Sequence, residues 1–202
     1  GPYGIGSMGK CAYEFVDFLV EAGQTYWQVL PLGPTSYGDS PYQSFSTFAG
    51  NPYFIDLDFL VIDGFLEEKD LEGINWGTEP MYVDYAHIYE NRFDVLRKAY
   101  KAFMKKGDLA AFSTYCKKEE KWLDNYALFM ALKNLHGGKC WREWEKPFYS
   151  HDEKALEKFR KENAEELGFW KYLQYEFTRQ WNNLKNYANE RGIKIIGDLP
   201  IY

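Results

Sequence analysis

The sequence has few cysteines, and they form no recognisable pattern. Cys11, Cys116 and Cys140 are odd in number, far apart and outside any CxxC spacing. This usage argues against a disulfide framework or a cysteine zinc site and favours free thiols in a reducing compartment. We therefore expect a cytoplasmic protein.

Long apolar runs are also missing. The run over residues 53–62 is interrupted by Asp56 and Asp58, and it falls well short of the roughly 20 apolar residues that a membrane helix needs. The charge pattern offers no basic face for a nucleic acid. The net charge is −6, and basic residues are mixed with acidic ones, as in residues 117–121. Neither a membrane nor a nucleic acid is an expected partner.

Histidines and the common catalytic motifs are scarce too. His87, His136 and His151 show no HExxH or paired-ligand spacing, so we assign them no metal or catalytic role. GxSxG, GxxxxGK and EF-hand patterns do not occur, which removes support for a serine hydrolase, a P-loop protein or a calcium sensor. We expect no metal and no cofactor.

Aromatic residues, in contrast, are abundant. They make up 19% of the 202 residues, and hydrophobic residues make up 46%. That apolar content predicts a packed core and excludes general disorder. The number of rings exceeds what a core of this size requires, so many should lie at surfaces, grooves or sugar sites.

Periodicity predicts a mainly helical chain with two short strands. We expect a helix over residues 9–22, a buried strand over 25–30 and a strand over 193–196. Between the strands, the pattern first predicts an extended piece over 51–56 and a short helix beginning at Asp58. It then predicts a helical block over 90–135, a helix capped by Ser150 or Asp152, and a long helix over 164–190.

This order of elements predicts an α/β architecture. Parallel strands need helical crossovers, so the two strands should flank a large helical insertion, which we place at residues 64–165 of a partial barrel or sheet domain covering 1–202. Two strands cannot close a barrel, which takes about 250 residues. We therefore expect the chain to be a fragment.

The segment over residues 33–46 is a candidate sugar-binding loop. It follows the end of the first strand, the edge where α/β folds bind ligands. Its side chains include hydroxyls, a carboxylate and flat rings, which suit the hydroxyl rim and C–H faces of glucose: Tyr37, Asp39, Ser40 and Tyr42. The alternative is a polar turn whose tyrosines pack on the core.

A second polar group follows the second strand. Asp198, in Gly-Asp-Leu-Pro, lies where barrel enzymes carry substrate contacts, although a single Asp could equally cap a helix or join an ion pair. Because both polar groups follow strand ends, we expect them to face the same rim.

Two further motifs have structural alternatives. Residues 4–9 match GxGxxG before a helix, but no strand precedes them and no acidic residue ends the next strand, so a tight turn is favoured over a nucleotide site. Trp141 and Trp144 are three apart, which would place both on one helix face, where packing is the more common role.

The chain resembles the amylomaltase family, the 4-α-glucanotransferases of glycoside hydrolase family 77. The similarity covers essentially the whole chain, and residues 37–44 and 192–202 are its most specific parts. The blocks that carry the similarity are 2–6, 26–34, 37–44, 49–52, 141–144 and 192–202.

The resemblance implies the N-terminal part of a (β/α)8 TIM barrel with helical insertions. It also implies transfer of an α-1,4-glucan segment to the 4-hydroxyl of an acceptor by a retaining mechanism, with α-1,4-glucans and maltodextrins as partners. By the same resemblance Ser40 and Tyr42 would contact donor glucose units, Tyr37 and Asp39 would line the groove, and Asp198 would lie near the cleavage point.

The resemblance places the catalytic residues outside this chain. The family's nucleophilic Asp, acid/base Glu and third Asp belong to later barrel strands, so residues 1–202 would hold substrate-binding residues alone and be inactive in isolation. The competing hypothesis is a non-catalytic glucan-binding module, which the same loop chemistry would serve.

Overall fold

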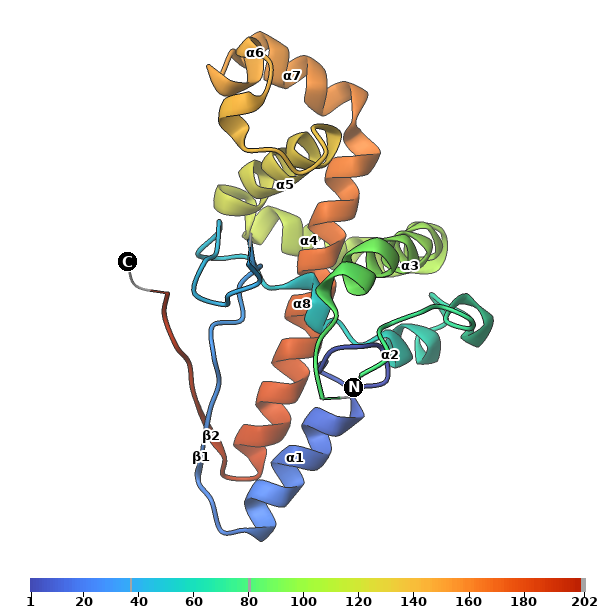
Figure 1. Ribbon diagram of the computed structural model, residues 1–202, viewed down its shortest axis with the longest axis vertical. Coiled ribbons are helices and arrows are strands. Elements are labelled where there is room, and N and C mark those ends of the chain that lie inside the picture. Colours follow the sequence, from blue (N-terminus) through green and yellow to red (C-terminus); the bar gives the residue numbers. More distant parts are fainter. Residues whose placement is uncertain (37, 80, 201–202) are drawn as a thin grey trace. The chain divides into compact units, whose positions relative to one another are not determined.

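The computed structural model describes residues 1–36, 38–79 and 81–200, and the described chain is mainly helical (Figure 1). Three short 3-10 helices are labelled η. The elements, in chain order, are α1 (Lys10–Glu21), β1 (Tyr26–Gln28), η1 (Pro52–Phe54), α2 (Leu57–Ile62), η2 (Glu68–Asp70), α3 (Tyr85–Lys106), α4 (Leu109–Lys118), α5 (Glu120–Leu135), η3 (Trp141–Glu143), α6 (Lys146–Tyr149), α7 (Glu153–Glu162), α8 (Ala164–Glu190) and β2 (Lys194–Ile196). Within these ranges no helix is both long and apolar enough to cross a bilayer.

The predicted parallel pairing of the two strands is confirmed. Tyr26 is opposite Lys194 and Gln28 is opposite Ile196, and Figure 1 shows β1 and β2 side by side. The Val29 N–H extends the ladder to the Ile196 carbonyl at 2.9 Å. The carboxyl ends of both strands therefore lie at the same edge.

The expectation of a buried first strand is wrong for the described chain. Trp27 points to the covered face, where its ring packs edge-on against Phe15 of α1 at 5.4 Å. Tyr26 is 55% exposed and Ile196 is 45% exposed. Side chains alternate across a sheet, so one face of this pair is covered and the other is open among the described residues.

Two local predictions before α2 are also wrong, because short polar side chains cap turns that the pattern did not reveal. Residues 51–56 are not extended: the Asn51 side chain accepts the Tyr53 N–H at 3.0 Å and starts η1. Asp56, not Asp58, caps α2 by accepting the Phe59 N–H at 3.1 Å. Side-chain acceptors of this kind satisfy amides that a helix start leaves unpaired.

The later helices agree with the sequence more closely. The long helix predicted over 164–190 is α8, and Asp152 caps α7 by accepting the Ala155 N–H at 2.9 Å. The helical block predicted over 90–135 consists of α3, α4 and α5, with α3 beginning earlier, at Tyr85 behind the Asp84 cap.

The chain divides into two compact units. Unit 1 comprises Gly1–Leu109 with Leu173–Tyr202, and unit 2 comprises Ala110–Tyr172. The predicted insertion over 64–165 is not one of these units, because α3 groups with unit 1. An insertion with those bounds relative to a barrel stays a prediction.

Unit 1 is organised around α8, whose glutamines bind the backbone of residues 50–56. Gln174 accepts the Gly50 N–H at 2.7 Å and donates to the Gly50 carbonyl at 2.9 Å. Gln180 accepts the Asp56 N–H at 2.7 Å and donates to the Asp56 carbonyl at 3.2 Å. A side-chain amide has the same donor and acceptor as a peptide, so each glutamine satisfies both backbone groups of one buried residue.

The same segment is enclosed by further buried groups. A Cβ at Gly50 would lie 2.2 Å from the Phe177 ring, so only glycine allows this approach. Arg92 of α3 is fully buried and donates to the Ile55 carbonyl. Burial lowers the pKa of Arg92 to about 10, against the opposing effect of the nearby Asp56 carboxylate. The guanidinium therefore remains charged at neutral pH.

Unit 2 is built on α5, most of whose central turns are buried. Its buried residues are Leu123, Tyr126, Ala127, Leu128, Met130, Ala131 and Leu132. The start of α8 contributes Phe169 and Tyr172, both fully buried, and α7 contributes Leu156 and Phe159. A helix with a broad buried apolar surface is typical of the core of a helical bundle.

We expect Gln174→Leu to destabilise the protein by roughly 2–4 kcal/mol, because the Gly50 N–H and carbonyl would be left buried without partners. The free energy of unfolding, from urea denaturation followed by circular dichroism, measures this effect. Gln24→Leu is the control, because Gln24 is exposed and its side chain donates to the Ala22 carbonyl at 3.3 Å. It should change stability by less than about 0.5 kcal/mol. Equal effects of the two substitutions would contradict the role assigned to Gln174.

Candidate functional site at the carboxyl end of the strands

The predicted sugar loop begins directly beyond β1 and is closed at its base. The Asn51 N–H donates to the Leu32 carbonyl at 2.8 Å, so the two ends of the loop are joined. Inside it, the Ser36 N–H donates to the Gln43 carbonyl and the Gln43 N–H donates to the Ser40 carbonyl, each at 3.1 Å. The loop is therefore a folded structure with its own hydrogen bonds.

The tip of the loop requires left-handed backbone. Gly38 has φ of 87° and Asp39 has φ of 54°. Glycine adopts this region without cost and aspartate tolerates it better than most residues, which explains the Gly-Asp pair at this point. The turn is closed by the Asp39 N–H, which donates to the Ser36 carbonyl at 3.1 Å.

The structure brings two of the predicted site residues into direct contact. The Tyr42 hydroxyl donates a hydrogen bond of 2.8 Å to Oδ2 of Asp198, across 156 residues of sequence. Oδ1 of Asp198 accepts the Leu199 N–H at 2.8 Å. Both side chains are half-buried. The loop and the end of β2 thus share one rim, and the carboxylate is oriented through both of its oxygens.

The other predicted residues lie in the same loop. Ser40 is half-buried, and its Oγ accepts the Tyr42 N–H at 3.3 Å, so the serine supports the tyrosine beside it. Asp39 is half-buried at the tip. Tyr37 falls outside the described residues, so its placement in the groove stays a prediction.

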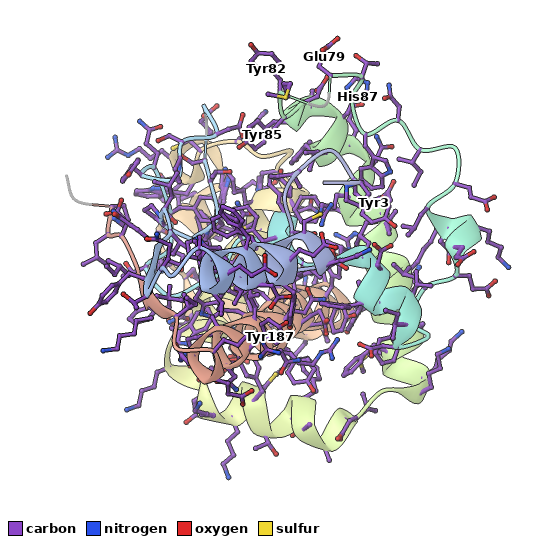
Figure 2. The ribbon with its side chains drawn as sticks, turned by 90° about the horizontal axis from the view of Figure 1, so that it is seen from below. Tyr3, Glu79, Tyr82, Tyr85, His87 and Tyr187 are labelled. Atoms are coloured by element: carbon purple, nitrogen blue, oxygen red, sulfur yellow. The ribbon has the colours of Figure 1, made fainter. Side chains whose placement is uncertain are left out.

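Sequence reasoning missed a group of rings near Asp39. Burial, and then the Asp39 carboxylate, raise the pKa of Tyr53 to about 12, and the same two causes raise the pKa of Tyr85. The Tyr53 and Tyr85 ring centroids are 6.4 Å apart, and Tyr53 also lies 5.8 Å from Phe93. Figure 2 shows Tyr85 with Tyr82 near the start of α3. The signal in the sequence was the apolar spacing that predicted a helical block over 90–135, and it indicated a helix without a site.

The glycine-rich turn over residues 4–9 has a packing role. A Cβ at Gly4 would lie 2.2 Å from the Trp76 carbonyl oxygen, and one at Gly9 would lie 1.9 Å from Oδ2 of Asp56. The same Oδ2 accepts the Ser7 hydroxyl at 2.6 Å. A carboxylate therefore lies at the start of α1, where a nucleotide phosphate would have to bind, which supports the tight-turn interpretation.

The two tryptophans of unit 2 do not share a helix face, contrary to the sequence expectation. Trp141 begins the 3-10 helix η3 and is 44% exposed, whereas Trp144 follows η3 and is 7% exposed. The switch from α to 3-10 geometry changes the angle between residues three apart. Among the described residues, no cluster of His, Cys, Asp and Glu could hold a metal ion.

Comparison with known proteins places the chain in a family. A family model described as 4-alpha-glucanotransferase matches residues 1–202, and the chain belongs to that family. The 4-alpha-glucanotransferase of Clostridium butyricum is 53% identical over 202 residues, covering 100% of this chain and 41% of the relative. That of Streptococcus pneumoniae is 50% identical over 203 residues, covering 100% and 40%.

Solved structures show the same similarity. An amylomaltase from Streptococcus agalactiae in complex with acarbose matches with a TM-score of 0.95 and 47% identity, covering 100% of this chain and 41% of that one. An amylomaltase from Corynebacterium glutamicum shares the fold at 16% identity with a TM-score of 0.67, covering 98% and 28%. The chain thus spans about two fifths of the length of the curated relatives described above.

A double-mutant cycle tests the Tyr42–Asp198 contact. We expect Tyr42→Phe and Asp198→Ala to show a coupling of about 1 kcal/mol in the free energy of unfolding, since each removes the same charge-assisted hydrogen bond. Tyr42→Phe combined with Asp17→Asn is the control, because Asp17 accepts from Tyr187 instead. Additive effects in the first cycle would show that the two side chains do not interact.

Proposed function

We propose that the full-length protein containing this chain is a 4-α-glucanotransferase that moves an α-1,4-glucan segment from a donor to the 4-hydroxyl of an acceptor glucan or glucose. The family assignment supports the reaction class. The single structural observation that supports it is the Tyr42–Asp198 pair, which joins a polar loop to the end of the neighbouring strand. The acarbose complex of the Streptococcus agalactiae relative supports oligosaccharides as partners.

The pair is suited to binding sugar hydroxyls. The Tyr42 hydroxyl donates its proton to Asp198. A phenol can accept as well as donate a hydrogen bond, and an aromatic ring suits the C–H face of a glucose unit. Asp198 can accept further hydrogen bonds, since each carboxylate oxygen has a second lone pair. We assign Ser40 and Tyr42 to donor glucose units, Tyr37 and Asp39 to the walls of the groove, and Asp198 to the neighbourhood of the cleavage point.

The reaction would proceed by double displacement with retention. A carboxylate attacks the anomeric carbon while a carboxylic acid protonates the departing oxygen. The acceptor 4-hydroxyl then displaces the enzyme carboxylate as the same acid/base residue takes its proton. Two carboxyl groups about 5 Å apart are needed. We place both of them, with a third aspartate, in the part of the protein outside residues 1–202.

We further infer that β1 and β2 are neighbouring strands of a (β/α)8 barrel. Their parallel pairing, the open face that exposes Tyr26 and Ile196, and the polar groups beyond their carboxyl ends all support this arrangement. A cytoplasmic location is part of the same proposal and rests on the three free cysteines.

In the full-length protein, we expect Tyr42→Phe to lower kcat/KM for maltotriose disproportionation about tenfold, because Asp198 loses the donor that orients it. The products can be separated and quantified by anion-exchange chromatography. Tyr149→Phe, at a tyrosine that is 41% exposed in unit 2, is the matched control and should keep the activity of the unaltered protein. Unchanged kcat/KM in Tyr42→Phe would remove Tyr42 from the site.

We also expect residues 1–202 alone to form no longer or shorter maltodextrins from maltotriose, whereas the full-length protein does. The same chromatographic assay tests both. Transfer by residues 1–202 would show that the catalytic carboxylates lie within them. Glucan binding by the full-length protein without transfer would instead favour the non-catalytic glucan-binding module.

A further inference from the structure

Unit 2 contains a pocket that the proposed reaction does not use. It lies between α5, the η3–α6 segment and α7, and its volume is about 530 Å³. This volume is within the range of small-molecule sites. Apolar side chains form most of its wall, and the other residues that line it include Asn125, Trp141, Trp144, His151, Glu153 and Arg160.

One part of the pocket is a fixed aromatic wall. The Trp144 indole N–H donates to the Lys139 carbonyl at 3.2 Å, and its ring stacks on His136 with centroids 5.2 Å apart and planes at 17°. Trp141 is more exposed, and the Arg142 guanidinium lies 5.5 Å from its ring centroid. Trp144 is therefore held rigidly, while Trp141 presents indole surface to solvent beside it.

The rim of the pocket has polar groups with no partner in the described part of the chain. The indole N–H of Trp141 and the side chains of Asn125, His151 and Glu153 make no hydrogen bond there. His151 also has φ of 56°, a left-handed backbone that is uncommon outside glycine. Residues in such conformations concentrate at binding sites, so the backbone agrees with the unpartnered side chains.

These groups define the chemistry of a suitable ligand. Flat apolar rings favour a molecule with C–H faces, and an indole N–H, an amide, an imidazole and a carboxylate favour one with many hydroxyls. A phosphate-bearing ligand fits poorly, because the Glu153 carboxylate would repel it and Arg160 is already bonded to Glu157 at 3.2 Å. A neutral sugar chain satisfies both requirements.

We propose that this pocket binds a short segment of α-1,4-glucan, as a site separate from the loop over residues 33–46. The choice of glucan over other sugars rests on the proposed function. A long substrate bound here has its other end held at a high local concentration, so the site would favour long glucans over short ones. Maltotriose, which is too short to use two sites, would gain nothing.

Binding can be measured at Trp141 itself, independently of transfer activity. The full-length protein is labelled with 5-fluorotryptophan, and the Trp141 ¹⁹F signal is identified by its loss in Trp141→Phe. We expect maltoheptaose to shift this signal and cellohexaose, a β-1,4-linked glucan one glucose unit shorter, to leave it unchanged. A Trp141 signal that does not respond to maltoheptaose overturns the proposal. So does a signal that shows no H₂O/D₂O isotope shift before the sugar is added, because another segment of the protein then fills the pocket.

Steady-state kinetics test whether the pocket makes the enzyme favour long glucans. We expect Trp141→Ala to raise KM for amylose about tenfold while kcat/KM for maltotriose stays unchanged. Tyr149→Ala is the matched control, since Tyr149 is an exposed ring of the adjacent α6 that does not line the pocket. Equal KM for amylose in both variants overturns the proposed role. If the unaltered protein transfers no glucan, the proposed function fails, whereas the ¹⁹F shift still decides whether the pocket binds glucan.

Discussion

The arrangement of unit 1 depends on a buried polar network around residues 50–56. The buried polar or charged side chains of the described chain all belong to it: Asn51, Asp56, Arg92, Gln174, Glu176 and Gln180. Asn51 and Asp56 cap local turns. Arg92 of α3, with Gln174 and Gln180 of α8, binds the backbone of residues 50–56. Glu176 completes the network by accepting from Gln180 at 2.8 Å and from Arg179 at 2.7 Å.

This network holds the loop that carries the candidate site. The loop over residues 33–50 leaves β1 and returns at Asn51, whose N–H closes the loop on Leu32. Its last residue, Gly50, is held by Gln174 through both backbone groups. The strand pair then fixes Asp198 relative to the start of the loop, so Tyr42 meets Asp198 because both ends of its loop are anchored.

The sequence was sufficient to predict features that follow from one-dimensional patterns. Parallel strands were predictable because the predicted helices between them provide the crossover. The common rim of the loop and Asp198 followed from this pairing, since parallel strands end at the same edge. The family-specific motif at residues 37–44 then indicated sugar binding, which composition alone had left open.

Other features were not predictable, because they depend on contacts between residues far apart in the sequence. Gln174 and Gln180 look like ordinary polar positions of an amphipathic helix, and nothing local shows that they are buried against Gly50 and Asp56. The helical pattern over 90–135 likewise gave no sign that the Asp39 carboxylate would raise the pKa of Tyr85. Nothing in the sequence indicated that Trp141 would begin a 3-10 helix and line a pocket in unit 2.

The use of buried amides at this point has a physical rationale. Apolar packing of similar volume would stabilise the interface between α8 and residues 50–56, but it would tolerate small shifts of one against the other. A glutamine that pairs with one N–H and one carbonyl tolerates no such shift, because a displaced segment would leave both groups buried and unpaired. Gln174 and Gln180 are six residues apart on α8 and bind backbone positions that are also six apart. Two such pairs fix both the register and the direction of the segment. A loop that must hold a tyrosine at 2.8 Å from a carboxylate on another strand requires that degree of control.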